Sequence, residues 1–225
     1  MDLCKNKTME HNFNNFYVYD GNRFTFEIIK NIADTKDVKY SPILVVGKSG
    51  TGKSHLMNAL ENSMKNKLKV VKISSEEFAT SFTEDVVYKE YCQADIFIIE
   101  DIQFLSNKKQ IQNRILDIMK KLLANNKKVL FTVGMERKQI KDLDFVNEII
   151  ENFEDAIILD IVIDVDDGAK TSILEKLKAE YNLKINDRET EILVKECNTV
   201  VEMKNRLNAR KLLKENFNGD NKWKK

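Results

Sequence analysis

The sequence predicts an α/β domain built on a parallel sheet of five strands, followed by a small helical domain. Short apolar runs alternate with segments of helical periodicity from residue 43 to about residue 165, which is the pattern of βαβ units with helices on both faces of a sheet. After Val165 only helical patterns follow. We therefore expect a three-layer αβα sandwich and a helical domain between two terminal tails. The expected parts are residues 1–12, 13–165, 166–217 and 218–225.

Five apolar runs are the predicted strands. The third run is almost entirely apolar, as expected of a strand that helices cover on both faces. The predicted strands are Ile43–Val46, Val70–Ser74, Ile96–Ile99, Val129–Thr132 and Ile157–Ile163.

Helices are predicted between and after these strands. In residues 109–128, apolar side chains recur at helical spacing and form one stripe. The second domain should contain three helices. Two of them begin at a capping residue, Asn186 or Thr199, that a glutamate follows three positions later. The three helices are predicted at residues 168–183, from Asn186 onward, and from Thr199 to about Phe217.

Composition excludes several classes of protein. The chain has 225 residues, of which 42% are hydrophobic and 32% charged, so it can bury a sizeable core. The 37 Lys and Arg nearly balance the 36 Asp and Glu, which argues against a nucleic-acid binder that works by bulk charge. The three cysteines are far apart and odd in number, and we see neither a membrane-length apolar run nor a signal peptide. We expect a cytoplasmic protein without a disulfide framework.

The loop after the first strand has a phosphate-binding pattern. Its sequence GKSGTGKS satisfies G-x-x-x-x-G-K-[ST], the P-loop or Walker A motif, between a strand and a helix. Its glycines let successive N–H groups surround phosphate oxygens, and a helix N-terminus favours an anion. Lys53 would reach the β- and γ-phosphates, and Ser54 would bind Mg²⁺. The alternative is a turn that only connects the two elements. The predicted nucleotide-binding residues are Gly47, Lys48, Ser49, Gly50, Thr51, Gly52, Lys53, Ser54 and His55.

Two adjacent carboxylates, Glu100 and Asp101, follow the third strand. They are predicted catalytic residues, with Glu100 also in the Mg²⁺ shell, because a parallel sheet can bring this strand end beside the P-loop. The order is the reverse of the usual one. Asp101 would fall short of the water that it should polarise by roughly one bond length, and a misplacement of about 1 Å can cost on the order of 10²-fold in rate. The pair supports binding better than turnover. The alternative is that both residues merely close a strand.

These motifs resemble the ATPase domain of the bacterial replication initiator DnaA, a member of the AAA+ class. The similar stretches are FNNFYVYDGNRF, GKSGTGKSHLMNAL and IIEDIQFLSNKK, and the likeness extends over about residues 13–215. It implies a P-loop NTPase fold whose helical domain is a lid, with ATP or ADP and Mg²⁺ held between the two. It also implies that Tyr17, Val18 and Asn22 belong to the adenine pocket.

The chain departs from the family pattern near the phosphates. The two acids are commonly both Asp in the family, so Glu100 is a departure. An acidic sensor that faces the γ-phosphate after the fourth strand is replaced by Gly134, while Thr132 is retained nearby as a candidate catalytic residue. The resemblance therefore implies a degenerate ATPase site.

The arginines of the family are also missing. The segment before the last strand should carry two, one of which completes the neighbouring subunit's site, but Glu148 and Asn152 stand there. Val201 occupies the position of the lid arginine, and Arg206 lies elsewhere on the same helix. An arginine finger can contribute about 10³–10⁵ in rate, so hydrolysis should be weak or absent. The alternative is that other residues compensate.

Specific DNA binding by the chain alone is not expected. The chain ends just after the lid, where the family's DNA-reading helix-turn-helix domain would follow. The stretch between Phe78 and Asp95 is shorter than the one with which the initiator grips single-stranded DNA. We expect weak or no direct binding to duplex DNA.

Three functions follow from the resemblance. The first is a nucleotide-bound regulator that docks on the replication initiator, as short relatives such as Hda suggest, although residues 1–16 contain no clamp-binding peptide of that type. The second is a helicase-loader-type ATPase that acts with the replicative helicase. The third is a scaffold with a vestigial nucleotide site.

Overall fold

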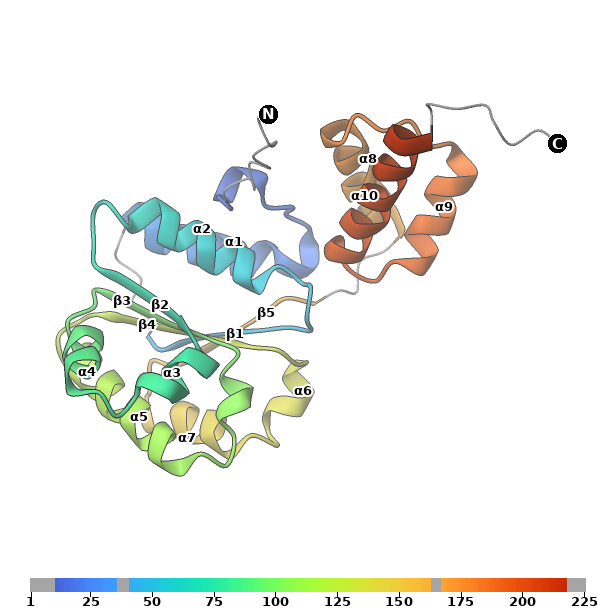
Figure 1. Ribbon diagram of the computed structural model, residues 1–225. Coiled ribbons are helices and arrows are strands. Elements are labelled where there is room, and N and C mark those ends of the chain that lie inside the picture. Colours follow the sequence, from blue (N-terminus) through green and yellow to red (C-terminus); the bar gives the residue numbers. More distant parts are fainter. Residues whose placement is uncertain (1–10, 36–40, 163–166, 218–225) are drawn as a thin grey trace.

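A computed structural model describes residues 11–35, 41–162 and 167–217 of the chain. It contains a parallel sheet of five strands in the order β2-β3-β4-β1-β5 (Figure 1). The fifth strand is predicted to run to Ile163, but it ends at Asp160, and the described residues Ile161 and Val162 lie beyond it. Residues 163–166, which include the predicted strand end and the predicted domain boundary, lie outside the described residues, as do residues 1–10 and the whole predicted tail 218–225. The strands are β1 (Ile43–Val46), β2 (Val70–Ser74), β3 (Ile96–Glu100), β4 (Lys128–Val133) and β5 (Ile157–Asp160).

Helices cover both faces of this sheet (Figure 1). On one face, Ile29 and Leu60 belong to a cluster that includes Val45 of β1; on the other face, Ile115 and Met119 pack with Phe97 of β3. The central strands are therefore apolar on both sides, which explains their nearly continuous hydrophobic runs. The first face carries α1 (Asp20–Thr35) and α2 (Lys53–Met64), and the second α3 (Ser75–Ser81), α4 (Asp85–Cys92), α5 (Lys109–Ala124), α6 (Arg137–Ile140) and α7 (Asp144–Asn152). The predicted αβα sandwich is confirmed.

Three further helices form a bundle beside the sheet domain (Figure 1). They have a core of their own that includes Leu174, Leu193 and Leu207, and Tyr19 from the segment before α1 joins it. Asn186 and Glu189 form the predicted capping box, and the Thr199 hydroxyl accepts a hydrogen bond from the N–H of Glu202. The helices are α8 (Asp167–Glu180), α9 (Asp187–Glu196) and α10 (Val200–Phe217).

The sheet order brings three strand ends together. β1 lies beside β4, with Val46 opposite Val133, and β4 lies beside β3, with Ile99 opposite Phe131. The loop after β1, the residues after β3 and the residues after β4 therefore share one edge of the sheet, where α/β folds bind ligands. Among the described residues, no helix combines the length and the apolar character that a membrane crossing requires.

Candidate functional site

The loop between β1 and α2 has the backbone of a phosphate cradle. Gly50 and Gly52 adopt φ values of +79° and +104°, which side chains other than glycine rarely allow. A Cβ on Gly52 would also lie 2.9 Å from the Phe16 ring. α2 begins at Lys53 without a side-chain cap from Gly52, and a helix N-terminus of this kind favours an anion.

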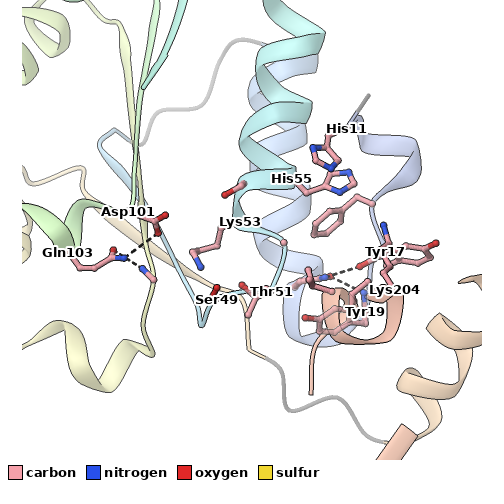
Figure 2. A pocket seen from close by; sticks show the side chains of 18 of the residues that line it. His11, Tyr17, Tyr19, Ser49, Thr51, Lys53, His55, Asp101, Gln103 and Lys204 are labelled. Carbon is pink, nitrogen blue, oxygen red and sulfur yellow. Dashed lines mark hydrogen bonds between the residues drawn. The ribbon is translucent and has the colours of Figure 1, made fainter. Parts of the chain in front are cut away.

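A cavity of about 550 Å³ opens between this loop, the segment before α1, the end of β3 and the first turns of α10 (Figure 2). Its volume is within the range of small-molecule sites. The lining residues are His11, Phe16, Tyr17, Tyr19, Asn22, Ser49, Gly50, Thr51, Gly52, Lys53, Ser54, His55, Asp101, Gln103, Phe104, Gly134, Val200, Val201 and Lys204.

Most of the predicted site residues line this cavity, and five do not. Gly47 and Lys48 line an adjacent cavity of about 750 Å³ between the P-loop, α6 and the start of α10. Val18 packs against the core beneath α1 and α2. The remaining two, Glu100 and Thr132, lie behind the cavity wall near Asp101.

Lys53 is buried beneath the loop and hydrogen-bonded to it. Its ammonium donates to the carbonyl oxygens of Gly47 at 2.7 Å and Lys48 at 2.9 Å. Burial lowers the pKa of Lys53, and the carboxylates of Asp101 and Glu100 oppose that shift. The ammonium is thus a buried positive charge on the floor of the cavity.

Asp101 has a fixed and unusual backbone. Its φ of 58° and ψ of 48° are left-handed. Its N–H donates to the Thr132 hydroxyl at 2.8 Å, and its carbonyl oxygen accepts from the Ser75 hydroxyl at 2.9 Å. Thr132 is fully buried, so it positions Asp101 and does not itself reach the cavity. Strained backbone of this kind clusters at functional sites.

Gln103 links Asp101 to Gly134. Its amide nitrogen donates to Asp101 Oδ1 at 3.3 Å, and its amide oxygen accepts from the Gly134 N–H at 2.8 Å (Figure 2). A Cβ on Gly134 would lie 2.5 Å from the Gln103 nitrogen. The glycine therefore leaves the room that the Gln103 amide occupies.

Glu100 differs from the sequence expectation. Its carboxylate lies 3.4 Å from the ammonium of Lys72, which is also 3.6 Å from Glu61. The other oxygen, Oε1, is buried and has no hydrogen-bond partner among the described residues. The carboxylate that reaches the cavity is that of Asp101, because the strand ends at Glu100 and the next residue turns into the left-handed region.

The other end of the cavity is aromatic. The His55 ring lies 4.4 Å from that of His11 and 5.2 Å from that of Phe16, measured between centroids. Burial lowers the pKa of His55 to about 4. Asn22 is almost fully buried, and its side-chain amide makes two hydrogen bonds to the backbone. It accepts from the Tyr19 N–H and donates to the Tyr17 carbonyl oxygen. It shapes the segment that presents Tyr17.

The residues at the positions where the resemblance predicts arginines make other contacts. On α7, Glu148 pairs with Lys109 at 2.9 Å, and the Asn152 amide donates to the Glu148 carbonyl oxygen. On α10, Val201 lines the cavity and is 46% exposed, whereas Arg206 pairs with Glu196 of α9 and is not among the lining residues.

Sequence reasoning missed several lining residues. Gln103 and Phe104 follow shortly after Glu100 and Asp101, and this closeness in sequence could have indicated that they line the same cavity. Phe16 and Tyr19 lie inside the stretch that resembles the family's adenine pocket. Lys204 is one helical turn beyond Val201, so a search of positions i+3 and i+4 would have found it.

The chain is similar to known replication proteins. Residues 7–160 match the family of the bacterial DnaA ATPase domain. The chromosomal replication initiator protein DnaA of Nautilia profundicola is 30% identical over 159 residues, which is 68% of this chain and 36% of that protein. The chain thus spans about a third of the length of this curated relative.

Solved structures agree on the fold. The structure of AMPPCP-bound DnaA from Aquifex aeolicus has a TM-score of 0.81 and 25% identity, covering 93% of this chain and 68% of that one. A DnaC helicase loader has a TM-score of 0.54 and 15% identity, covering 68% of this chain and 98% of that one, a likeness of fold alone. Because the family match covers more than half of the chain, the protein belongs to the bacterial DnaA ATPase domain family, an AAA+ family of DNA replication initiation.

Proposed function

We propose that this chain binds ATP or ADP in the cavity between the P-loop and the lid. One observation carries the proposal: a single cavity joins a buried ammonium at a helix N-terminus, a carboxylate and an aromatic end. These are the groups that phosphates, Mg²⁺ and a purine base require. The binding of AMPPCP to the Aquifex aeolicus relative supports the assignment.

Mg²⁺ would bind together with the nucleotide, between phosphate oxygens and side chains of the cavity. The Ser54 hydroxyl and the Asp101 carboxylate both line the cavity and offer the oxygen ligands that Mg²⁺ prefers together with phosphate oxygens. No cluster of three or more His, Cys, Asp or Glu side chains could hold a metal within the described residues. We assign the metal-ligand role to Asp101 in place of Glu100, since Glu100 faces Lys72.

The chain then acts in DNA replication initiation as a docking protein with weak or absent hydrolysis. In the described part of the chain, the Lys and Arg side chains that line the cavity are Lys53 and Lys204. Gly134 stands where the resemblance places an acidic sensor of the γ-phosphate. Glu148 and Asn152 stand where it places two arginines, one of which completes the neighbouring subunit's site. The partner we propose is the replication initiator itself.

A helicase-loader-type ATPase is the second candidate, because the Asp101 carboxylate is still aimed at the cavity. Turnover would then need a cation donated by a partner, with the replicative helicase as the cargo. A scaffold with a vestigial site is the third.

Titration with a fluorescent ADP or ATP analogue tests the site. We expect saturable binding that Lys53→Ala abolishes. Lys120→Ala is the matched control, because it removes the same charge from an exposed site on α5 that is not part of the cavity lining; this variant should bind normally. No binding by the unmodified chain would leave only the scaffold.

Hydrolysis separates the two remaining functions. Phosphate release that disappears in Asp101→Asn, and rises when helicase is added, would support the loader. Binding without turnover, together with capture of the initiator in a pull-down, would support the docking protein.

A further inference from the structure

The lid contributes a lysine to the cavity at a position that the family pattern does not mark. Lys204 of α10 is half-buried and lines the cavity. In Figure 2 it lies beside Tyr17, on the opposite side of the view from Asp101, with Lys53 between them. Val201, one turn earlier on the same helix, brings only an apolar side chain to the cavity.

Lys204 rests on a ring that connects the two domains. Its ammonium lies 5.4 Å from the centroid of the Tyr17 ring, a cation–π distance. The Tyr17 hydroxyl donates to a carboxylate oxygen of Glu180 in α8 at 2.5 Å. Tyr17 stands before α1, in the sheet domain, so its side chain contacts two helices of the lid at once.

The charge of Lys204 also acts on the His55 ring at the aromatic end of the cavity. His55 belongs to the first turn of α2, whose N-terminus forms part of the cradle. Its pKa is lowered mainly by burial; a hydrogen bond with the Asn12 carbonyl oxygen opposes that shift, and the charge of Lys204 adds to it. Lys204 and the first turn of α2 line the same cavity, so both face a ligand bound there.

We propose that Lys204 is a nucleotide-binding residue, whose ammonium contacts the phosphate chain from the lid side of the cavity. It supplies the positive charge that Val201 lacks, from one turn further along α10. The proposal rests on the proposed nucleotide site. A phosphate oxygen is a stronger partner for an ammonium than an aromatic ring. Lys204 therefore exchanges the Tyr17 ring for phosphate when nucleotide binds, which ties the lid to the ligand.

The test is the affinity for ADP of variants at position 204, measured by isothermal titration calorimetry. Lys204→Met keeps the length of the side chain and removes its charge; we expect affinity to fall roughly tenfold or more, as for the loss of a charge-assisted hydrogen bond. Lys204→Arg should stay within about threefold of the unmodified chain. Lys176→Met is the matched control, because it removes the same charge from an exposed site on α8.

The outcomes are distinguishable. If the unmodified chain does not bind ADP, the proposed nucleotide site fails. If ADP binds and Lys53→Ala abolishes binding, but Lys204→Met has no effect, only the role of Lys204 is overturned. If Lys204→Met lowers the thermal-unfolding midpoint without ADP, and Lys204→Arg does not restore affinity, the residue is structural and the proposal is again overturned.

Discussion

At the scale of single residues, the site depends on how Asp101 is held. A non-glycine residue in the left-handed region costs on the order of 1–3 kcal/mol, and the neighbouring hydroxyls of Thr132 and Ser75 offset that cost by bonding its N–H and carbonyl oxygen. Adjacent strands β3 and β4 place Thr132 beside Asp101. The backbone conformation of Asp101, at the end of β3, is thus stabilised by Thr132 of the neighbouring strand β4.

Thr132→Val should weaken this support without changing the shape of the core. The Asp101 N–H would lose its acceptor, at a cost of about 1–3 kcal/mol in the free energy of unfolding. Urea denaturation measures that loss. Thr132→Ser keeps the hydroxyl and serves as the control. If the valine variant is as stable as the serine variant, the hydrogen bond is not a significant constraint.

Gly134→Ala should displace the Gln103 amide from Asp101. The new Cβ would lie 2.5 Å from the Gln103 nitrogen and 3.2 Å from Asp101 Oδ1, and the flexible Gln103 side chain is the part that can move. We expect weaker affinity for Mg·ADP and little effect on folding. In a double-mutant cycle, Gly134→Ala should add little once Gln103→Ala has removed the amide. Additive losses of affinity would contradict this explanation.

At the scale of elements, the lid helices depend on their caps. Asn186 Oδ1 accepts from the Glu189 N–H at 2.8 Å, and the Glu189 carboxylate accepts from the Asn186 N–H at 3.2 Å. Asn186→Ala should destabilise α9 by about 1 kcal/mol, seen as faster amide hydrogen exchange in α9. Asn186→Asp can still accept the bond and is the control. Unchanged exchange in the alanine variant would show that packing alone holds the helix.

The sequence predicted some elements better than others, for physical reasons. β1 and β3 are buried on both faces, so their sequences are unbroken apolar runs that predict strands correctly. For β5 the sequence predicts a strand as far as Ile163, but the strand ends at Asp160. The Asp160 carboxylate pairs with Arg137 at 2.5 Å, and the N–H of Ile161 makes one more hydrogen bond, to the Val46 carbonyl oxygen at 2.7 Å. Apolar composition continues past this point, so hydrophobicity alone could not mark the end.

Contacts between segments that are distant in the sequence limit how much of the site the sequence can predict. The P-loop was predictable because its glycines and lysine are consecutive. The contact of Lys204 with Tyr17, and the turn of Glu100 toward Lys72, depend on how separate elements pack. The sequence shows that Gly134 departs from the family pattern. Only the structure shows that the Gln103 amide occupies the room that a side chain at position 134 would need.

At the scale of the whole molecule, the P-loop is in contact with the lid. A Cβ on Gly50 would lie 3.3 Å from the Thr199 hydroxyl, just before α10. Tyr17 joins the same two bodies from the other side of the cavity through Glu180 and Lys204. A ligand held in this cavity would contact both domains, so its binding should couple to the stability of the whole chain.

His55 should make that stability depend on pH. Its pKa is about 4 in the folded chain, against 6.5 for an unperturbed histidine, so between these values the unfolded chain binds more protons than the folded one. The contribution of His55 to stability is therefore complete above about pH 6.5 and is lost as pH falls toward 4. His55→Gln should flatten this part of the stability curve in urea denaturation.

The His55 imidazole also reports on the proposed ligand. Its NMR titration in the free chain should have a midpoint near pH 4, because burial disfavours the imidazolium. Phosphate groups bound at the first turn of α2 would favour the charged ring, so saturating ADP should raise the midpoint. Lys53→Ala, which cannot retain the nucleotide, should show the low midpoint with and without ADP. A midpoint near 6.5 in the free chain would contradict the buried environment, and an ADP-independent midpoint in the unmodified chain would place the phosphates elsewhere.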